Sequence, residues 1–314
     1  MKQTAGWGDT ELVTRVFAAA DIGSNTAHLL VAATDGSLVM RINNYNEWIS
    51  LGETVAKTGV IQKEQTQQLV LAVKEFLRIA KENEAVSLYV FGTEAMRAAQ
   101  NCLQVIKRIS SETGVLVDII SPRREAELSL GGVRLDTKHM GAEMLFEVGG
   151  GSAQIGRIRA QRLAEEESLP LGTGRVIAES GLRSPTSELQ LRAAENYIKS
   201  VLEESQIEAP GTAAVASGGV ARGLWRALHP DGEKTLALEE IEYMAWAAAR
   251  MPLDRIMTRF GVKAKRAGTM LAGALIYRAL LNRFGSKEMI LSEFGIREGA
   301  ILQMAAGDIT GCPV

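Results

Sequence analysis

The chain has 314 residues, of which 46% are hydrophobic, and it carries a formal net charge of −2 with a sequence pI near 6.1. This length is sufficient for two domains with full cores, and the charge excludes a general attraction to nucleic acid or to an anionic membrane. We therefore expect no nucleic-acid or membrane partner. A polyanionic ligand would need a locally basic site.

Cysteines, histidines and apolar runs narrow the class further. Cys102 and Cys312 are too far apart in sequence to form a redox or metal-ligand motif, and His28, His139 and His229 lack the spacing of a zinc site. No apolar run reaches the roughly 18 residues that a membrane span needs. These features predict a cytoplasmic protein with reduced thiols.

In chain order, the first half opens as a β-meander and continues with alternating helices and strands. The sequence predicts strands at Val16–Ala20, His28–Ala33, Leu38–Ile42, Ser87–Phe91 and Val115–Ile120, and helices at Gln65–Lys81, Met96–Ser110 and Arg123–Val133. This alternation indicates an α/β domain with a mixed sheet.

The second half repeats the opening pattern after a polar stretch near residue 136. The predicted strands are Met144–Val148, Ala153–Ile158, Arg162–Ser168, Thr212–Ser217 and Glu288–Ser292, and the predicted helices are Thr186–Ser205, Val220–Leu228, Leu238–Ala249, Lys263–Phe284 and Arg297–Ala306. The segments AAADIGSNTAHLLVA and MLFEVGGGSAQIGRI share one order of strand, acidic residue, glycine turn and strand. We expect two α/β domains of one topology, residues 1–136 and 137–314, facing each other across a cleft. The final helix, about 297–308, is expected to pack back on the first domain.

Each repeat places an acidic residue at the end of its first strand and a glycine turn directly after it. In the first repeat, Asp21 precedes Gly23, Ser24, Asn25 and Thr26. Glycine lets backbone amides approach a phosphate, and the hydroxyl and amide groups can donate to its oxygens. An ordinary hairpin with an Asx turn is the other interpretation of this motif alone.

The second repeat offers Glu147 followed by Gly149, Gly150, Gly151 and Ser152. Consecutive glycines cost backbone entropy on folding, so either close approach to a ligand or a flexible hairpin explains them. Because two such turns in equivalent places could hold one phosphate from opposite sides, the pair predicts a phosphate site. Asp21 and Glu147 are the candidate metal ligands.

Further motifs make the chain resemble the exopolyphosphatase / guanosine pentaphosphate phosphohydrolase (Ppx/GppA) family, within the actin, sugar kinase and heat-shock ATPase superfamily. The resemblance runs from about Phe17 to Ala300. It rests on the two glycine motifs and on four other segments, ISLGETVAKTGVI, Thr93–Ala99, Ser217–Val220 and Ser292–Gly299. It implies two ribonuclease H-like (actin-like ATPase) domains.

The resemblance also implies metal-assisted hydrolysis of a terminal phosphoanhydride in polyphosphate or guanosine pentaphosphate. It assigns the water-activating carboxylate to Glu125, a water-orienting role to Gln154 and a phosphate contact to Arg97, with Mg²⁺ or another divalent cation at Asp21 and Glu147. Phosphoryl transfer depends mainly on a positioned nucleophile and on charge neutralisation, which suits these residues. We expect Arg124, beside Glu125, to keep that carboxylate ionised.

Four positions depart from the family pattern. Glu147 stands where the family usually has aspartate, and Gln154 and Arg124 stand where it usually has glutamate. Glu127 replaces an arginine. These changes leave open whether the protein is a hydrolase, a weakly active or inactive regulator that binds the same anions, or a kinase of the superfamily. A homodimer through the apolar faces of Ala245–Met251 and Leu271–Leu281 is a further expectation, with burial of these faces in the core as the alternative.

Overall fold

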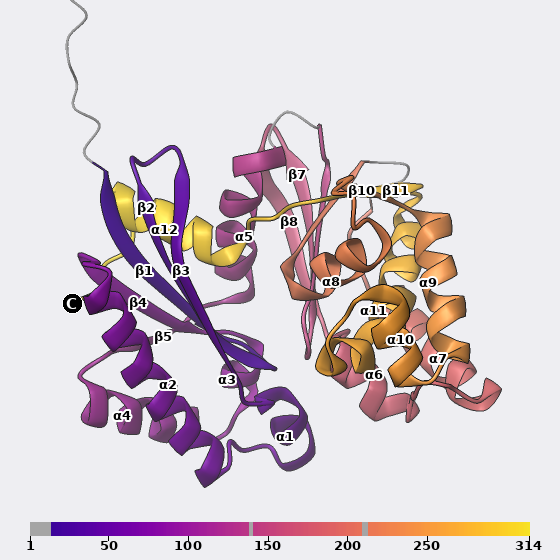
Figure 1. Cartoon of the computed structure of the whole chain (residues 1–314), viewed down its shortest axis with the longest axis horizontal. Helices are drawn as coiled ribbons and strands as arrows, with labels where there is room; N and C mark the ends of the chain where they lie inside the picture. The colour runs from indigo at the N-terminus through magenta and orange to yellow at the C-terminus, as the bar shows by residue number, and fades with distance from the viewer. Residues whose placement is uncertain (1–13, 138–140, 209–212) are drawn as a thin grey trace, which may run out of the picture.

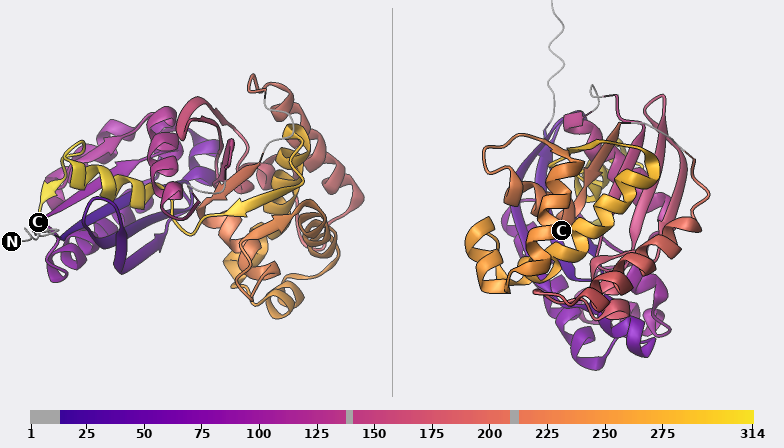
Figure 2. Two further views of the ribbon diagram at one scale, coloured as in Figure 1. Left: turned by 90° about the horizontal axis from the view of Figure 1, so that it is seen from above. Right: turned by 90° about the vertical axis from the view of Figure 1, so that its right-hand side faces the viewer.

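Two lobes, each built on a six-stranded sheet, make up the protein (Figure 1). The computed structural model describes residues 14–137, 141–208 and 213–314. Figure 2 shows that the C-terminal strand lies in the same lobe as the first strands, so the chain returns to the lobe where it began.

The first sheet combines an antiparallel meander with parallel strands. Strands β1 (Arg15–Ile22), β2 (Thr26–Thr34) and β3 (Val39–Trp48) form the meander, β4 (Ser87–Gly92) runs parallel to β1, and β5 (Val117–Ile119) runs parallel to β4. The short β12 (Cys312–Pro313) pairs antiparallel with β4.

The second sheet repeats this topology in five of its strands, and only the sixth strand is placed differently. Its meander is β6 (Met144–Val148), β7 (Ala153–Arg159) and β8 (Arg162–Leu169), followed by β9 (Ala214–Ser217) parallel to β6 and β11 (Glu288–Leu291) parallel to β9. β10 (Thr235–Ala237) pairs antiparallel with β11. The predicted α/β fold with two repeated domains is confirmed.

Helices, most of them amphipathic, complete each lobe outside its sheet. The first lobe has α1 (Leu51–Thr58), α2 (Lys63–Glu82), α3 (Glu94–Ala98) and α4 (Cys102–Thr113); the second has α6 (Thr173–Ser180), α7 (Glu188–Glu203), α8 (Gly218–Leu228), α9 (Leu238–Arg250), α10 (Leu253–Phe260) and α11 (Ala264–Phe284). In α2, the apolar positions Leu69, Val73 and Phe76 recur at helical spacing and are buried against the first sheet.

The inner faces are covered by two helices that are exchanged between the halves of the sequence. Helix α5 (Pro122–Thr137) packs Ala126, Leu130 and Val133 against the second sheet. Helix α12 (Ile296–Ala306) packs Ala300 and Ile301 against the first sheet. The predicted domain boundary at residue 136 falls in the last turn of α5, next to residues outside the described range, and it stays a prediction.

Helices α5 and α12 cross in backbone contact at two glycines. A Cβ atom built on Gly132 would lie 1.9 Å from the Gly295 carbonyl oxygen, and one built on Gly299 would lie 1.8 Å from the Leu128 carbonyl oxygen. No larger residue fits at either position without a backbone shift. The crossing lies between the lobes, as Figure 1 shows.

The predicted helix Met96–Ser110 is wrong, because the structure divides it into α3 and α4. Ala99 is extended, and the Asn101 side chain holds the backbone of Ile61 through two hydrogen bonds of 2.9 and 2.8 Å. An asparagine side chain that bonds to distant backbone groups competes with helix continuation. Helices α1, α6 and α10 and the short strands β10 and β12 were not predicted.

Most of the apolar residues considered for a dimer are part of the core, although Trp246 in the same range is 53% exposed. Ala245, Ala248, Leu271 and Leu275 are all buried in the largest apolar cluster, which fills the outer side of the second lobe. These four residues provide no dimer surface, and a homodimer stays a prediction. None of the helices among the described residues combines the length and apolar character that crossing a membrane requires.

Candidate active site

The two glycine turns are equivalent hairpins at the ends of equivalent strands. Asp21 pairs with His28 across the first hairpin, and Glu147 pairs with Gln154 across the second. Each turn is closed by a backbone hydrogen bond, Gly23 N to Thr26 O at 2.9 Å and Gly149 N to Ser152 O at 2.8 Å. The structure therefore brings the predicted metal and phosphate residues to the same position of each repeat.

The carbonyl groups of both turns are anchored to neighbouring segments. Ser24 O accepts from Gly52 N at 2.7 Å and Asn25 O accepts from residues 49 and 50, while Gly149 O and Gly150 O accept from the first residues of α6. The amides of Ser24, Asn25, Gly150 and Gly151 donate to no group in the described part of the chain. Such unpaired, neighbouring amides are suited to an anion.

The two turns also touch each other. A Cβ atom on Gly150 would lie 2.5 Å from the Asn25 side chain, and one on Gly151 would lie 2.2 Å from Glu94 Oε2 and 2.7 Å from Ser24 Oγ. An ion pair of 3.2 Å between Glu94 and Arg175 joins α3 to α6 beside them. The glycines thus allow close approach between the lobes, a reason for them that the sequence did not indicate.

Glu125 lies at the start of α5 in a buried ion pair with Arg97. The Arg97 Nη1 atom donates to Glu125 Oε2 at 2.8 Å and to the Ile120 carbonyl oxygen at 2.8 Å. Burial raises the pKa of Glu125 to about 7, opposed by the charge and hydrogen bond of Arg97 and reinforced by the negative charges of Glu147 and Asp21. The carboxyl group is therefore poised to exchange a proton near neutral pH.

The expectation that Arg124 keeps Glu125 ionised is wrong. Arg124 lies 3.9 Å from Glu127 instead, in an i, i+3 pair on the exposed side of α5. Consecutive residues of a helix point about 100° apart, so Arg124 faces away when Glu125 faces inward. The cation beside Glu125 comes from α3, as Arg97.

Glu147 and Gln154 lie side by side on adjacent strands under α5. The hydroxyl groups of Ser129 and Ser217 both donate to Glu147 Oε2, the latter at 3.1 Å. Gln154 is buried, and its Nε2 donates to Ser168 Oγ at 3.2 Å. Its Oε1 is buried with no hydrogen-bond partner among the described residues, which is unusual for a buried amide oxygen.

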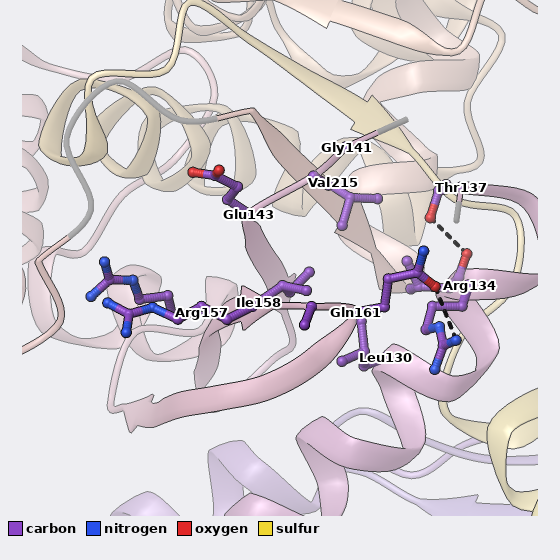
Figure 3. Close-up of a pocket in the computed structure, with 13 residues that line it drawn as sticks. Leu130, Arg134, Thr137, Gly141, Glu143, Arg157, Ile158, Gln161 and Val215 are labelled. Atoms are coloured by element: carbon purple, nitrogen blue, oxygen red, sulfur yellow. Dashed lines mark hydrogen bonds between the residues drawn. The ribbon is translucent and has the colours of Figure 1, made fainter. Parts of the chain in front are cut away.

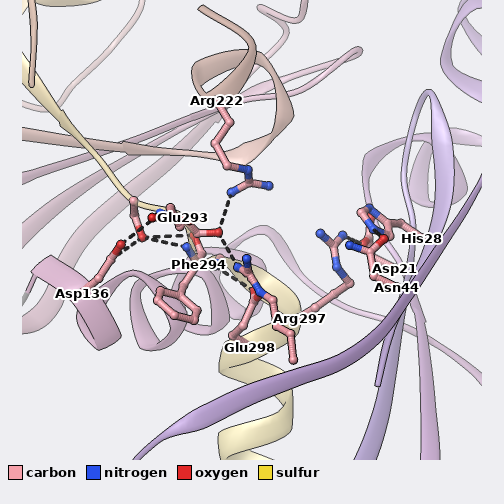
Figure 4. Close-up of polar contacts among 12 residues, drawn as sticks. Asp21, His28, Asn44, Asp136, Arg222, Glu293, Phe294, Arg297 and Glu298 are labelled. Carbon is pink, nitrogen blue, oxygen red and sulfur yellow. Dashed lines mark hydrogen bonds and ion pairs between the residues drawn. The ribbon is translucent and has the colours of Figure 1, made fainter. Parts of the chain in front are cut away.

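Asp21 is paired with a cation from the last helix, Arg297. Its Oδ1 accepts from Arg297 Nη1, and both side chains are largely buried (Figure 4). Burial, with the positive charge of Arg297, lowers the pKa of the neighbouring His28 to about 4, so that imidazole is neutral. Arg222 of α8 points toward the same region and donates to the Glu293 carbonyl oxygen at 3.5 Å.

Comparison with known proteins decides the family. The sequence model of the Ppx/GppA phosphatase family matches residues 30–307. The chain belongs to the Ppx/GppA phosphatase family. Because this family consists of phosphatases, the protein is classed as a phosphatase, a type of hydrolase.

Relatives and solved structures are similar over nearly the whole chain. Exopolyphosphatase 1 of Mycobacterium leprae is 26% identical over 93% of this chain and 90% of its own length, and that of Mycobacterium tuberculosis is 27% identical over 93% and 88%. The structure of an Aquifex aeolicus Ppx/GppA family member matches with a TM-score of 0.81 at 24% identity, covering 95% of this chain and 100% of that chain. An exopolyphosphatase structure from Cytophaga hutchinsonii matches with a TM-score of 0.80 at 21% identity, covering 93% and 98%. These two structures confirm the fold.

The protein offers only two free carboxylate oxygens to the metal that the Ppx/GppA resemblance implies. Asp21 Oδ2 and Glu147 Oε1 accept no hydrogen bond from a described residue. Each oxygen faces a glycine: Asp21 Oδ2 would lie 3.5 Å from a Cβ atom built on Gly23, and Glu147 Oε1 would lie 3.2 Å from one built on Gly218. Among described residues, no three acidic, histidine or cysteine side chains gather as a metal site. Mg²⁺ commonly takes one or two carboxylates and completes its shell with waters and phosphates, so the residues fit that mode.

Several residues of this Ppx/GppA site were missed in the sequence. Glu94 and Arg297 lie inside motifs that carried the resemblance, whereas Ser129, Arg175 and Arg222 had no signal of their own. A separate pocket of about 440 Å³ lies between α5 and one end of strands β6 and β7 (Figure 3). Arg134, Arg157 and Gln161 line it, and none of the predicted site residues does.

Proposed function

We propose that the chain hydrolyses the terminal phosphoanhydride of inorganic polyphosphate and releases orthophosphate. The observation that carries this proposal is the position of Glu125, a buried carboxyl with a pKa near 7, paired with Arg97 and within the electrostatic influence of Asp21 and Glu147. The names of the mycobacterial relatives, exopolyphosphatase 1, support polyphosphate as the substrate.

In this proposal Glu125 accepts a proton from the attacking water. The water oxygen forms a bond to the terminal phosphorus while the bridging P–O bond breaks, and the shortened chain leaves with its oxygen. A general base whose pKa is close to the working pH is largely deprotonated and is still basic enough to accept the proton from water. The unpartnered Gln154 Oε1 is available to orient that water without adding charge.

In this proposal the terminal phosphate is held by amides of both glycine turns, beside the point where the turns touch. The unpaired amides of Ser24, Asn25, Gly150 and Gly151 donate to its oxygens. Arg97 uses only Nη1 for Glu125 and Ile120, so its Nε and Nη2 are left for a phosphate oxygen. The amides span both lobes, so a bound phosphate would hold the lobes together.

Asp21 Oδ2 and Glu147 Oε1 are the protein oxygens proposed to hold Mg²⁺ or another divalent cation. A divalent cation there supplies neutralisation of phosphate charge, which phosphoryl transfer requires. Glu147 is fixed by Ser129 and Ser217, so its free oxygen keeps one direction.

The proposal is tested by orthophosphate release from long polyphosphate, short polyphosphate, guanosine pentaphosphate and ATP, each with and without Mg²⁺. We expect release from polyphosphate that depends on Mg²⁺. Binding of polyphosphate with no release above that of a Glu125→Gln variant would overturn the hydrolase and favour the regulator. Preferred release from guanosine pentaphosphate would keep the hydrolase and replace the substrate, and transfer of labelled phosphate from ATP to an acceptor would identify a kinase.

The pKa of Glu125 predicts the pH dependence of the reaction. Because a general base acts in its deprotonated form, kcat/KM is expected to fall about tenfold per pH unit below pH 7 and to level off above it. The measurement is kcat/KM for polyphosphate between about pH 5 and 9. Glu127→Gln, on the exposed side of the same helix, is the control and is expected to keep the fall in kcat/KM below pH 7. A flat profile through pH 7 would contradict the assignment.

A further inference from the structure

The Asp21 carboxylate already has a cation bound to it within the first lobe. Arg297 enters from the first turn of α12, its guanidinium donates to Asp21 Oδ1, and only 13% of its side chain is exposed. Helix α12 packs on the first sheet through Ala300 and Ile301, and Asp21 is part of that sheet. The pair therefore belongs to one lobe and does not depend on how the two lobes are placed.

The surrounding charges are arranged in the same way. Arg41 pairs with the buried Glu298 at 2.6 Å, and Arg97 pairs with Glu125 at 2.8 Å. Arg222 is the further cation in the electrostatic field of Glu147. Each carboxylate of the site thus has an arginine beside it or near it, and the site has little negative charge left to attract a free metal ion.

We propose that Arg297 acts as a resident counter-cation of Asp21 that keeps a divalent cation from binding there until phosphate arrives with it. A metal ion on Asp21 Oδ2 would lie on the same carboxylate as the guanidinium on Oδ1, and the two positive charges would repel. A phosphate chain between the glycine turns adds negative charge beside both cations and removes this penalty. The proposal rests on the proposed function, since it names how the same site loads its metal.

Arg297 is thereby a positioning residue that sets the order of binding. It keeps Oδ1 of Asp21 occupied, so only the opposite oxygen, facing Gly23, is open to a ligand. A purely structural ion pair would stabilise α12 on the first sheet and leave the metal affinity of the free protein unchanged. These two roles differ in a measurement that involves no turnover.

The test is a titration of the full chain with Mn²⁺, followed by electron paramagnetic resonance of the free ion, with and without a methylene-bridged polyphosphate analogue. Mn²⁺ is suitable because carboxylate and phosphate oxygens coordinate it as they coordinate Mg²⁺. In the unmodified chain we expect weak binding of Mn²⁺ alone and, beyond the Mn²⁺ that the analogue binds without protein, binding at least about tenfold tighter with the analogue, as removal of like-charge repulsion predicts. Tight binding of Mn²⁺ alone, unaffected by the analogue, would overturn the proposal.

Variants separate a specific effect from a general change of charge. Arg297→Gln is expected to bind Mn²⁺ alone about tenfold more tightly or better, and Arg297→Lys to remain like the unmodified chain. Arg41→Gln removes an equal charge next to Glu298 and is expected to have a clearly smaller effect. Equal gains in Arg41→Gln and Arg297→Gln, or no gain in Arg297→Gln, would refute the role.

A double variant protects the test against misfolding. Asp21→Asn with Arg297→Gln has no uncompensated charge at the pair, and we expect it to lose the gain seen in Arg297→Gln. If the double variant keeps that gain, the metal binds elsewhere and the proposal fails. If the Mn²⁺ titrations contradict the role of Arg297 but phosphate release is normal, the proposed function stays intact. If the Mn²⁺ titrations give the expected results but no phosphate is released, only the proposed function is overturned.

Discussion

Glu125→Gln is expected to lower the turnover number for polyphosphate by roughly a hundredfold or more, the scale of a lost general base. The change keeps the size of the side chain and removes its ability to take a proton. Arg97 can still donate to the glutamine oxygen, so the geometry of the ion pair at 2.8 Å is largely retained. The measurement is kcat and KM for polyphosphate from the initial rate of orthophosphate release.

The division between kcat and KM makes this prediction specific. A base acts only as the water attacks, so kcat falls while KM changes little. Glu127→Gln, which removes a carboxylate from the exposed side of the same helix, is the matched control and is expected to keep normal kinetics. Near-normal kcat in Glu125→Gln would remove Glu125 from the mechanism.

Gly299→Ala is expected to destabilise the fold by about 3 kcal/mol, the upper range for overpacking a tight core. The added methyl carbon would lie 1.8 Å from the Leu128 carbonyl oxygen, an atom of the α5 backbone that no side-chain rotation can move. The two helices would have to separate along the length of their crossing. Urea unfolding followed by circular dichroism measures the change in free energy of unfolding.

Gly268→Ala is the control for the same substitution in a helix. Gly268 lies in α11, and a Cβ atom built there meets nothing within 4 Å. With no clash, alanine gains helix propensity, and we expect stabilisation of up to about 1 kcal/mol. If both variants change stability alike, the contact between α5 and α12 does not limit the residue at position 299.

The meanders and their turns were predictable because their signals are local. Apolar strands around Asp21–Thr26 and Glu147–Ser152 define each hairpin, and the repeat of the pattern predicted the second sheet. The break at Asn101 was not predictable in this way. It depends on hydrogen bonds to Ile61, forty residues earlier in the chain.

Charge partners in the site were the least predictable feature. Sequence adjacency favoured Arg124 as the partner of Glu125, whereas folding brings Arg97 to it from another helix. The partner of Asp21 lies 276 residues further along the chain. Residue types and motif order thus indicated Asp21, Glu125 and Glu147 as candidate acids, but which arginine each acid meets depends on contacts between elements far apart in the sequence.

The exchange of α5 and α12 between the halves makes folding of each lobe depend on the other. Residues 14–137 alone would leave the inner face of the first sheet, including Phe17 and Phe91, without its covering helix. They would also carry α5 without the second sheet that buries its apolar side. The halves are therefore complementary fragments rather than independent folding units. Loss of structure in one lobe exposes apolar side chains of the other lobe's core to water. Although the sequence reads as a tandem duplication, each half of the molecule it encodes supplies a helix to the core of the other.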